Sequence, residues 1–256
     1  NLSLENVKEL WLSLPPLPEQ QRIAESLGEV DKLIESLDEQ IEKKRRIAQG
    51  LAHDLLGMRN GKNEPIRRLP GFKGKWERKR LDDIGTILKG SGICRAESNT
   101  GNIPAIRYGE IYTHHNNIVK QYVSFISEKV ALGATQLKAG DVVFAGSGET
   151  VEEIGKSVAI LNDGVYAGGD TIVFSPKMEV APIFWGYLLN EPYVQKQKSL
   201  KGQGATIVHI RPSDIAAIEV CFPKLAEQQA IAEVLAAADS EIAALEEKER
   251  KYEQIK

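Results

Sequence analysis

The chain has 256 residues, of which 42% are hydrophobic, so it is long enough for one large or two modest domains. No apolar run approaches the roughly 20 residues needed to cross a bilayer, and the two distant cysteines form no ligand cluster or redox pair, so we expect a cytoplasmic protein without a membrane span. The net charge of −3 argues against a uniformly basic nucleic-acid binder. Charge is nevertheless segregated, because residues 67–80 carry seven cationic side chains and one acidic one.

A repeated segment organises the chain. Residues 15–48 begin PPLPEQQRIAESLGEVDKLIESLDEQ, and residues 223–256 begin PKLAEQQAIAEVLAAADSEIAALEEK, with identical residues recurring at an offset of 208. Such self-similarity indicates two copies of one structural unit. The match continues weakly upstream, so residues 1–14 are predicted to be the tail of a preceding domain. We expect either a natural half-length chain or a fragment of a longer protein.

Both copies are predicted to be long helices, at 15–60 and 223–256, with the first helical from about 19 to 56 and ended by Gly57. Their apolar residues recur at alternating spacings of three and four, which is typical of a coiled-coil seam. The two helices are expected to lie antiparallel or to pair two copies of the chain. The alternative is two amphipathic helices that pack on the intervening domain. The predicted seam consists of Ile23, Leu27, Val30, Ile34, Leu37, Ile41, Leu51, Leu55, Ile231, Leu235, Ala238, Ile242, Leu245 and Tyr252.

Residues 61–222 lose this spacing and gain glycine, β-branched and aromatic residues. Strands are predicted at 103–108, 119–125, 141–145, 157–161, 171–175 and 206–210. A helix is predicted at 182–197, and a shorter one from Pro212. The fold class is therefore α+β: a globular mixed domain flanked by two long helices that form an antiparallel coiled coil.

Several strings imitate catalytic motifs without completing them. Residues 146–150, Gly-Ser-Gly-Glu-Thr, lack the third glycine of a dinucleotide fingerprint and the lysine of a P-loop, so they are predicted to be a tight turn. Residues 190–193, Asn-Glu-Pro-Tyr, resemble an amino-methyltransferase motif, but Glu191 stands where that motif requires proline. The four histidines have no metal-site spacing. We predict no catalytic residue, metal or cofactor in this chain.

Both the helical segments and the middle of the chain resemble one known family. Pro-Pro-Leu-Pro-Glu-Gln-Gln-x-Ile-Ala at 15–24 resembles the repeated helical segments of type I restriction–modification specificity subunits, and 225–232 looks like the second such segment. Residues 74–85, 141–144 and 202–215 are similar to the start, a core strand and the exit of that family's target recognition domain. The resemblance implies a sequence-specific DNA-binding subunit that reads one half of a bipartite site. Residues 1–14 then correspond to the end of a first recognition domain.

The resemblance also implies partners. Duplex DNA, methyltransferase subunits and restriction subunits are the expected partners, together with a homodimer through the helices. S-adenosylmethionine, and ATP with magnesium, are expected on the partner subunits. Two alternatives stay open: a coiled-coil protein–protein scaffold, and the recognition segment of a fused restriction–methylation enzyme.

DNA contacts are predicted to come from three polar segments, because phosphates and base edges are bound by cationic, amide and hydroxyl side chains. The segments are 107–117, whose residues 110–117 are predicted to form a loop, the turn at 89–95, and 201–204. A solvated turn is the alternative for each. The basic run 67–80 is interpreted as phosphate positioning or linker solvation. The candidate residues are Lys89, Ser91, Arg95, Arg107, Tyr108, Tyr112, Thr113, His114, His115, Asn116, Asn117, Lys201 and Gln203.

Overall fold

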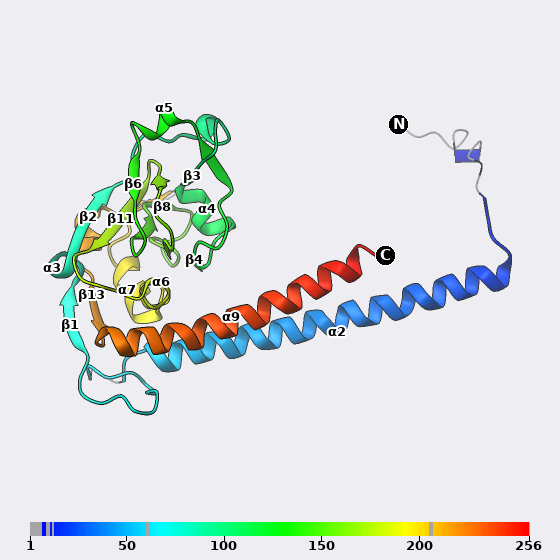
Figure 1. Ribbon diagram of the computed structural model, residues 1–256, viewed down its shortest axis with the longest axis horizontal. Coiled ribbons are helices and arrows are strands. Elements are labelled where there is room, and N and C mark those ends of the chain that lie inside the picture. The colour runs from blue at the N-terminus through cyan, green and yellow to red at the C-terminus, as the bar shows by residue number, and fades with distance from the viewer. Residues whose placement is uncertain (1–6, 9–10, 12, 60–61, 205–206, 256) are drawn as a thin grey trace. The chain divides into compact units, whose positions relative to one another are not determined.

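The computed structural model describes residues 7–8, 11, 13–59, 62–204 and 207–255 (Figure 1). They form two compact units, one made of residues up to 46 and from 240 onward, the other of residues 47–239. These divisions fall inside the two long helices, so the domain boundaries near 60 and 222 stay a prediction. Most of the predicted tail, 1–14, lies outside the described residues. No helix in the described ranges is both long and apolar enough to cross a membrane.

Two long helices are present, as the repeat predicts. Helix α2 spans Leu17–Leu56 and helix α9 spans Leu225–Glu253. Helix α2 ends at Gly57, whose N–H donates to the His53 carbonyl at 2.8 Å. A Cβ at position 57 would lie 2.5 Å from that same oxygen, so no side chain fits there.

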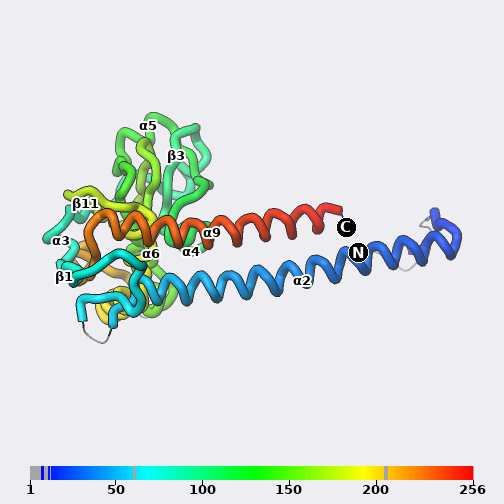
Figure 2. Tube along the Cα trace, turned by 60° about the horizontal axis from the view of Figure 1, so that its bottom comes forward, coloured from blue at the N-terminus to red at the C-terminus, as the bar shows by residue number. Residues whose placement is uncertain are grey.

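In the first unit, the part of α2 around residues 38–45 and the final portion of α9 lie side by side and antiparallel, and α2 begins beyond the end of α9 (Figures 1 and 2). Lys44 forms an ion pair with Glu241, and Asp38 shares a hydrogen bond with Glu249. Residue numbers therefore rise along one helix as they fall along the other. The Asp38 carboxyl raises the pKa of Glu249 through that shared hydrogen bond.

The predicted seam is buried over only part of the first unit. Leu37 and Ile41 are 1% and 3% exposed, whereas Ile23 and Leu27, nearer the start of α2, are 46% and 38% exposed. Val30, Ile34, Ile242, Leu245 and Tyr252 are half-buried. The apolar side chains of the seam are thus buried where α2 and α9 lie side by side. Its first two positions, Ile23 and Leu27, stay exposed to solvent.

The second unit is a mixed α+β domain built on two larger sheets. The five-stranded sheet has the order β2 (Gly85–Lys89), β11 (Thr171–Pro176), β7 (Val142–Ala145), β9 (Ser157–Ala159), β4 (Asn117–Ile118), and its β4–β9 pair is parallel. The four-stranded sheet has the order β5 (Ser124–Ile126), β3 (Ile103–Ile106), β10 (Val165–Ala167), β6 (Thr135–Leu137), and its β3–β10 pair is parallel. Two ribbons pair β1 (Glu77–Arg80) with β13 (Glu219–Phe222), and β8 (Ser147–Gly148) with β12 (Val208–His209).

Short helices connect these strands. They are α3 (Leu81–Ile84), the 3₁₀ turn η1 (Arg95–Glu97), α4 (Tyr108–Thr113), α5 (Glu128–Ala131), α6 (Pro182–Leu188), α7 (Pro192–Ser199) and α8 (Pro212–Ala216). The single helix predicted at 182–197 is wrong, because it is two helices. Pro192 starts the second one, and a proline both lacks an N–H and disfavours helical backbone in the residue before it.

The predicted strands and turns differ from the structure in several places. The strand predicted at 103–108 ends at Ile106, because Arg107 already caps helix α4. Most of 119–125 is irregular, and only its last two residues enter strand β5. Residues 147–148 form strand β8 after a bend at Gly146, instead of remaining a turn. Strands β1, β2, β4, β6, β10 and β13 were not predicted.

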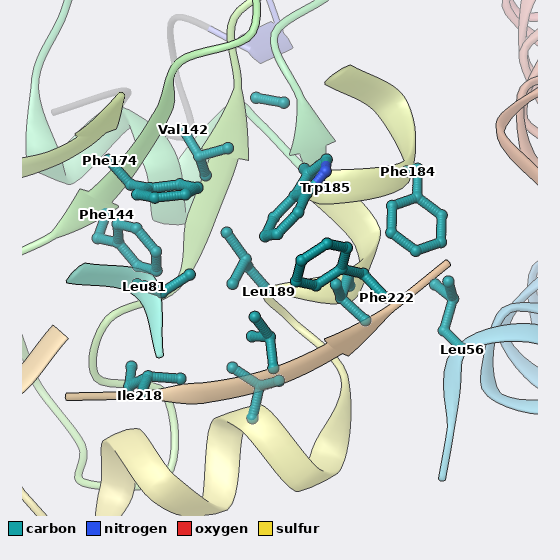
Figure 3. Close-up of a cluster of buried hydrophobic side chains, with 14 of the residues drawn as sticks. Leu56, Leu81, Val142, Phe144, Phe174, Phe184, Trp185, Leu189, Ile218 and Phe222 are labelled. Atoms are coloured by element: carbon teal, nitrogen blue, oxygen red, sulfur yellow. The ribbon is translucent and has the colours of Figure 1, made fainter. Parts of the chain in front are cut away.

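The five-stranded sheet is buried on both faces, which explains the unbroken apolar run of β7. Val142 and Phe144 join one core cluster with Trp185 (Figure 3). Val143 and Ala145, which alternate with them along the strand, join a second cluster on the opposite face. In a strand whose two faces are both buried, polar and apolar residues do not alternate, because neither face meets water.

Three residues of the predicted seam belong to this domain core. Leu55, Ile231 and Leu235 are 1–2% exposed and lie in the same cluster as Trp185. At these positions the helices behave as the alternative interpretation expects, with their apolar side against the intervening domain.

Candidate nucleic-acid interface

The second unit contains a cleft of about 820 Å³ with cationic, aromatic and imidazole side chains in its wall. It brings together two of the three predicted DNA-binding segments, 89–95 and 107–114, although they are separate in sequence. The lining residues are Lys89, Gly90, Ile93, Cys94, Arg95, Arg107, Tyr108, Gly109, Glu110, Thr113, His114, Gly169 and Asp170.

Helix α4 forms one wall of the cleft, so the prediction of a loop at 110–117 is wrong for its first four residues. The segment is helical because Ile111 is fully buried in the domain core, which anchors one side of the turn. The other side presents Tyr108, Thr113 and His114, all exposed and all in the cleft wall. A short helix therefore displays three polar or aromatic groups from a fixed backbone.

Arg107 sits at the N-cap of α4 in a buried polar network. Its backbone N–H donates to Glu110 Oε2 at 3.2 Å, and its Nε donates to Glu110 Oε1 at 2.7 Å. Ser124 from strand β5 also donates to Glu110 Oε1. Glu110 and Ser124 are 3% and 2% exposed, so the carboxylate is desolvated but fully partnered.

The end of strand β2 forms another wall. Gly90 lies so close to strand β11 that a Cβ would be 2.0 Å from Thr171 Oγ1, which fixes the chain path here. Lys89 and Arg95 are exposed on the cleft. Ser91 instead turns toward the backbone and donates to the Gly133 carbonyl at 3.1 Å, outside the cleft lining.

The rest of the 107–117 segment serves packing more than the cleft. Burial lowers the pKa of His115, which favours the neutral imidazole in its nearly closed site. Asn117 accepts a hydrogen bond from Asn190 at 3.0 Å. Burial raises the pKa of Tyr112, whose hydroxyl lies against Gly148. Asn116 is exposed but does not line the cleft.

The third predicted segment lies outside the cleft lining. Gln203 and His209 exchange two backbone hydrogen bonds, of 3.0 and 2.8 Å, which extend the β8–β12 ribbon. Lys201 is half-buried and Gln203 is exposed. Residues 205–206 lie outside the described ranges, and DNA contact by this segment stays a prediction.

Sequence reasoning missed the acidic members of the site. Glu110 and Asp170 line the cleft, and Glu110 is the residue that holds Arg107 in place. A signal was available, since an acidic residue three positions after an N-cap is a helix-start pattern. The helix-start pattern was overlooked because Arg107 occupies the N-cap, where serine or threonine is usual.

Comparison with known proteins places the chain in a family. A family model described as the type I restriction modification DNA specificity domain matches residues 1–44 and 73–256. The chain belongs to this family. The specificity subunit of type I restriction enzyme MjaVIII from Methanocaldococcus jannaschii is 29% identical over 267 residues, covering 98% of this chain and 59% of the relative.

Solved structures show the same fold. The S subunit of a type I restriction–modification system from M. genitalium gives a TM-score of 0.60 at 14% identity, covering 100% of this chain and 63% of that one. The HsdS subunit from Thermoanaerobacter tengcongensis gives 0.55 at 18% identity, covering 94% and 57%. The chain thus spans about three fifths of the length of these specificity-subunit relatives.

Proposed function

We propose that this chain is a DNA-recognition part of a type I restriction–modification system and reads one half of a bipartite site. The observation that carries the proposal is the cleft of the second unit, which gathers Lys89, Arg95 and Arg107 around Tyr108 and His114. It lies in a chain that belongs to a DNA specificity family. The protein's overall charge is negative, so this local gathering of cations matters more than the total.

Different side chains of the cleft suit different parts of DNA. Lys89 and Arg95 are exposed, as expected of residues that neutralise phosphates. Tyr108 and Thr113 lie on helix α4, and His114 is its C-cap. A helix fits the major groove, where each base pair has a distinct pattern of donors and acceptors. Phosphate contacts would position the domain, and contacts to base edges would select the sequence.

The long helices suit a spacing and docking role. In a type I system they would set the distance to a second half-site and bind methyltransferase subunits, with restriction subunits joining that core. S-adenosylmethionine, and ATP with magnesium, would then be held by those partners, and this chain would have no catalytic role. A homodimer through the helices is one way to supply the second half-site.

The direct test is selection of bound sequences from a randomised duplex library, using the full chain with its neighbouring methylating subunit. Enrichment of a short motif, with binding that weakens steeply as salt rises, is the expected result, because phosphate neutralisation releases counterions. A spaced inverted pair of motifs would indicate two copies of the chain. Absent or salt-insensitive binding would instead support a protein–protein scaffold.

Single cation replacements refine this test. Lys89→Ala or Arg95→Ala should each lower the slope of log affinity against log salt by about 1 and leave the motif unchanged. Lys177→Ala is the matched control, because Lys177 is exposed in the same unit but does not line the cleft. If all three changes have equal effects, the cleft is not the DNA-binding surface.

A further inference from the structure

Arg107 differs from the other cations of the cleft in how its guanidinium is held. Its Nε donates to Glu110 Oε1 at 2.7 Å and to Ser124 Oγ at 3.3 Å. Within the described part of the chain, neither Nη1 nor Nη2 donates a hydrogen bond. The Nε side of the guanidinium is therefore anchored. The outer edge, formed by Nη1 and Nη2, keeps two parallel N–H groups available as donors.

The anchor is rigid because its partners are buried. Glu110 and Ser124 are almost inaccessible, while the Arg107 side chain is 27% exposed at the cleft wall. A guanidinium fixed in this way has little conformational freedom left to lose when it binds. The free edge is thus presented to the cleft before DNA arrives.

Arg211 provides an internal contrast. It also occupies an N-cap, at the start of α8, and also pairs with the acidic residue three positions later. Its Nε and Nη2 both donate to Asp214, at 2.9 and 3.3 Å, but its side chain is 65% exposed and does not line the cleft. Both arginines serve helix capping, but of the two only Arg107 lines the cleft, where the buried Glu110 and Ser124 anchor it.

We propose that Arg107 reads a guanine of the recognition sequence through its two Nη groups, with Glu110 as the positioning residue. This inference rests on the proposed function. Two parallel donors match the O6 and N7 acceptors of guanine in the major groove, which is the commonest specific contact between arginine and DNA. Arg107 is recessed in the wall, whereas Lys89 and Arg95 are the exposed cations suited to phosphates.

The test compares bound-sequence selection for wild type, Arg107→Ala, Arg107→Lys and Arg211→Ala, each with the methylating subunit. Arg107→Ala should abolish the preference for guanine at one motif position, with about tenfold or greater loss of discrimination there. Arg107→Lys keeps the charge but lacks the fork, so it should retain salt-dependent binding and lose the same preference. Arg211→Ala should leave the motif unchanged.

Glu110→Gln tests the positioning role, because the amide keeps the side chain's shape and weakens its hold on the guanidinium. It should reduce the preference at the same motif position, which a purely structural role would not do. A circular dichroism spectrum matching wild type establishes that each variant is folded. If Arg107→Lys keeps the wild-type motif, Arg107 binds phosphate and the inference fails while the proposed function stands. If wild type enriches no motif, the proposed function itself fails.

Discussion

The two copies of the repeat begin with the same residues and end in different surroundings. At the start of α2, Ile23 and Leu27 are 46% and 38% exposed, whereas their counterparts in α9, Ile231 and Leu235, are each 1% exposed. The apolar spacing is equal in both copies, so it specifies a helix with one apolar side. Whether that side is buried depends on what packs against it, and only α9 begins against the domain core.

The hydrogen bonds of the two copies show the same contrast between a shared local bond and a contact to the domain core. Gln20 donates to the Pro15 carbonyl at 2.7 Å, and Gln228 donates to the Pro223 carbonyl at 2.9 Å, so the local helix-entry bond is present twice. Gln228 also accepts the indole N–H of Trp185 at 3.0 Å. The repeat therefore encodes the same local helix start in both copies. In the second copy, the same glutamine also binds the helix to the domain core through Trp185.

Truncating the buried leucine should have the largest effect. Leu235→Ala is expected to lower the free energy of unfolding of the second unit by about 3 kcal/mol, through lost burial and the cavity left behind. Leu27→Ala, its counterpart on the exposed side, should change stability by about 0.5 kcal/mol or less. Urea unfolding followed by tryptophan fluorescence measures both. Equal losses would mean that another surface covers the start of α2 in solution.

Removing the buried glutamate should come next. Glu227 accepts bonds from Arg68, at 2.8 and 2.7 Å, and from the indole of Trp76 at 3.2 Å. Glu227→Ala leaves both donors without this acceptor and should cost about 2 kcal/mol, limited because Arg68 can reach water. Glu19→Ala is the control on an exposed helix start. Equal urea midpoints for the two variants would show that the buried Glu227 stabilises the protein no more than the exposed Glu19.

Replacing the glutamine should have a smaller effect. Gln228→Ala leaves the Trp185 indole N–H without its acceptor in a buried site, at a cost of about 1 kcal/mol or more. Gln20→Ala loses only the exposed bond to Pro15 and should change stability by a few tenths of a kcal/mol. Thermal melts of the two variants at matched concentration measure the difference. A larger loss for Gln20 than for Gln228 would show that the local bond dominates.

The other end of α2 makes a pH-dependent contribution within the second unit. Burial raises the pKa of Glu191 to about 7, and the hydrogen bond with His53 at 3.2 Å opposes that rise. The folded protein then holds a proton that the unfolded chain releases near pH 4.5. Stability should fall as pH rises from about 5 to 7, by at most about 1 kcal/mol per pH unit. Glu191→Gln should flatten this slope in urea titrations, and an unchanged slope would exclude Glu191 as its source.

Elements set by interactions between residues close in sequence were predictable, and elements set by residues distant in sequence were not. The long helices were predictable because their spacing repeats every few residues. Helix α4 was mistaken for a loop because its polar composition hides Ile111, the residue that faces the core. The break before Pro192 carried a local signal that the surrounding helical pattern outweighed. Strand β1 consists of exposed charged residues and forms only because β13 pairs with it.

The sequence by itself determined the repeat, the two helices, the start of each after a proline, and the gathering of cationic residues in the middle of the chain. These depend on neighbours within about one or two helical turns, whose geometry is the same wherever the segment lies. Only the tertiary structure decided which helix start is buried and which arginine is anchored in the cleft wall. Those outcomes depend on partners distant in sequence, such as Arg68 for Glu227 and Ser124 for Arg107, and burial is a property of the assembled surface.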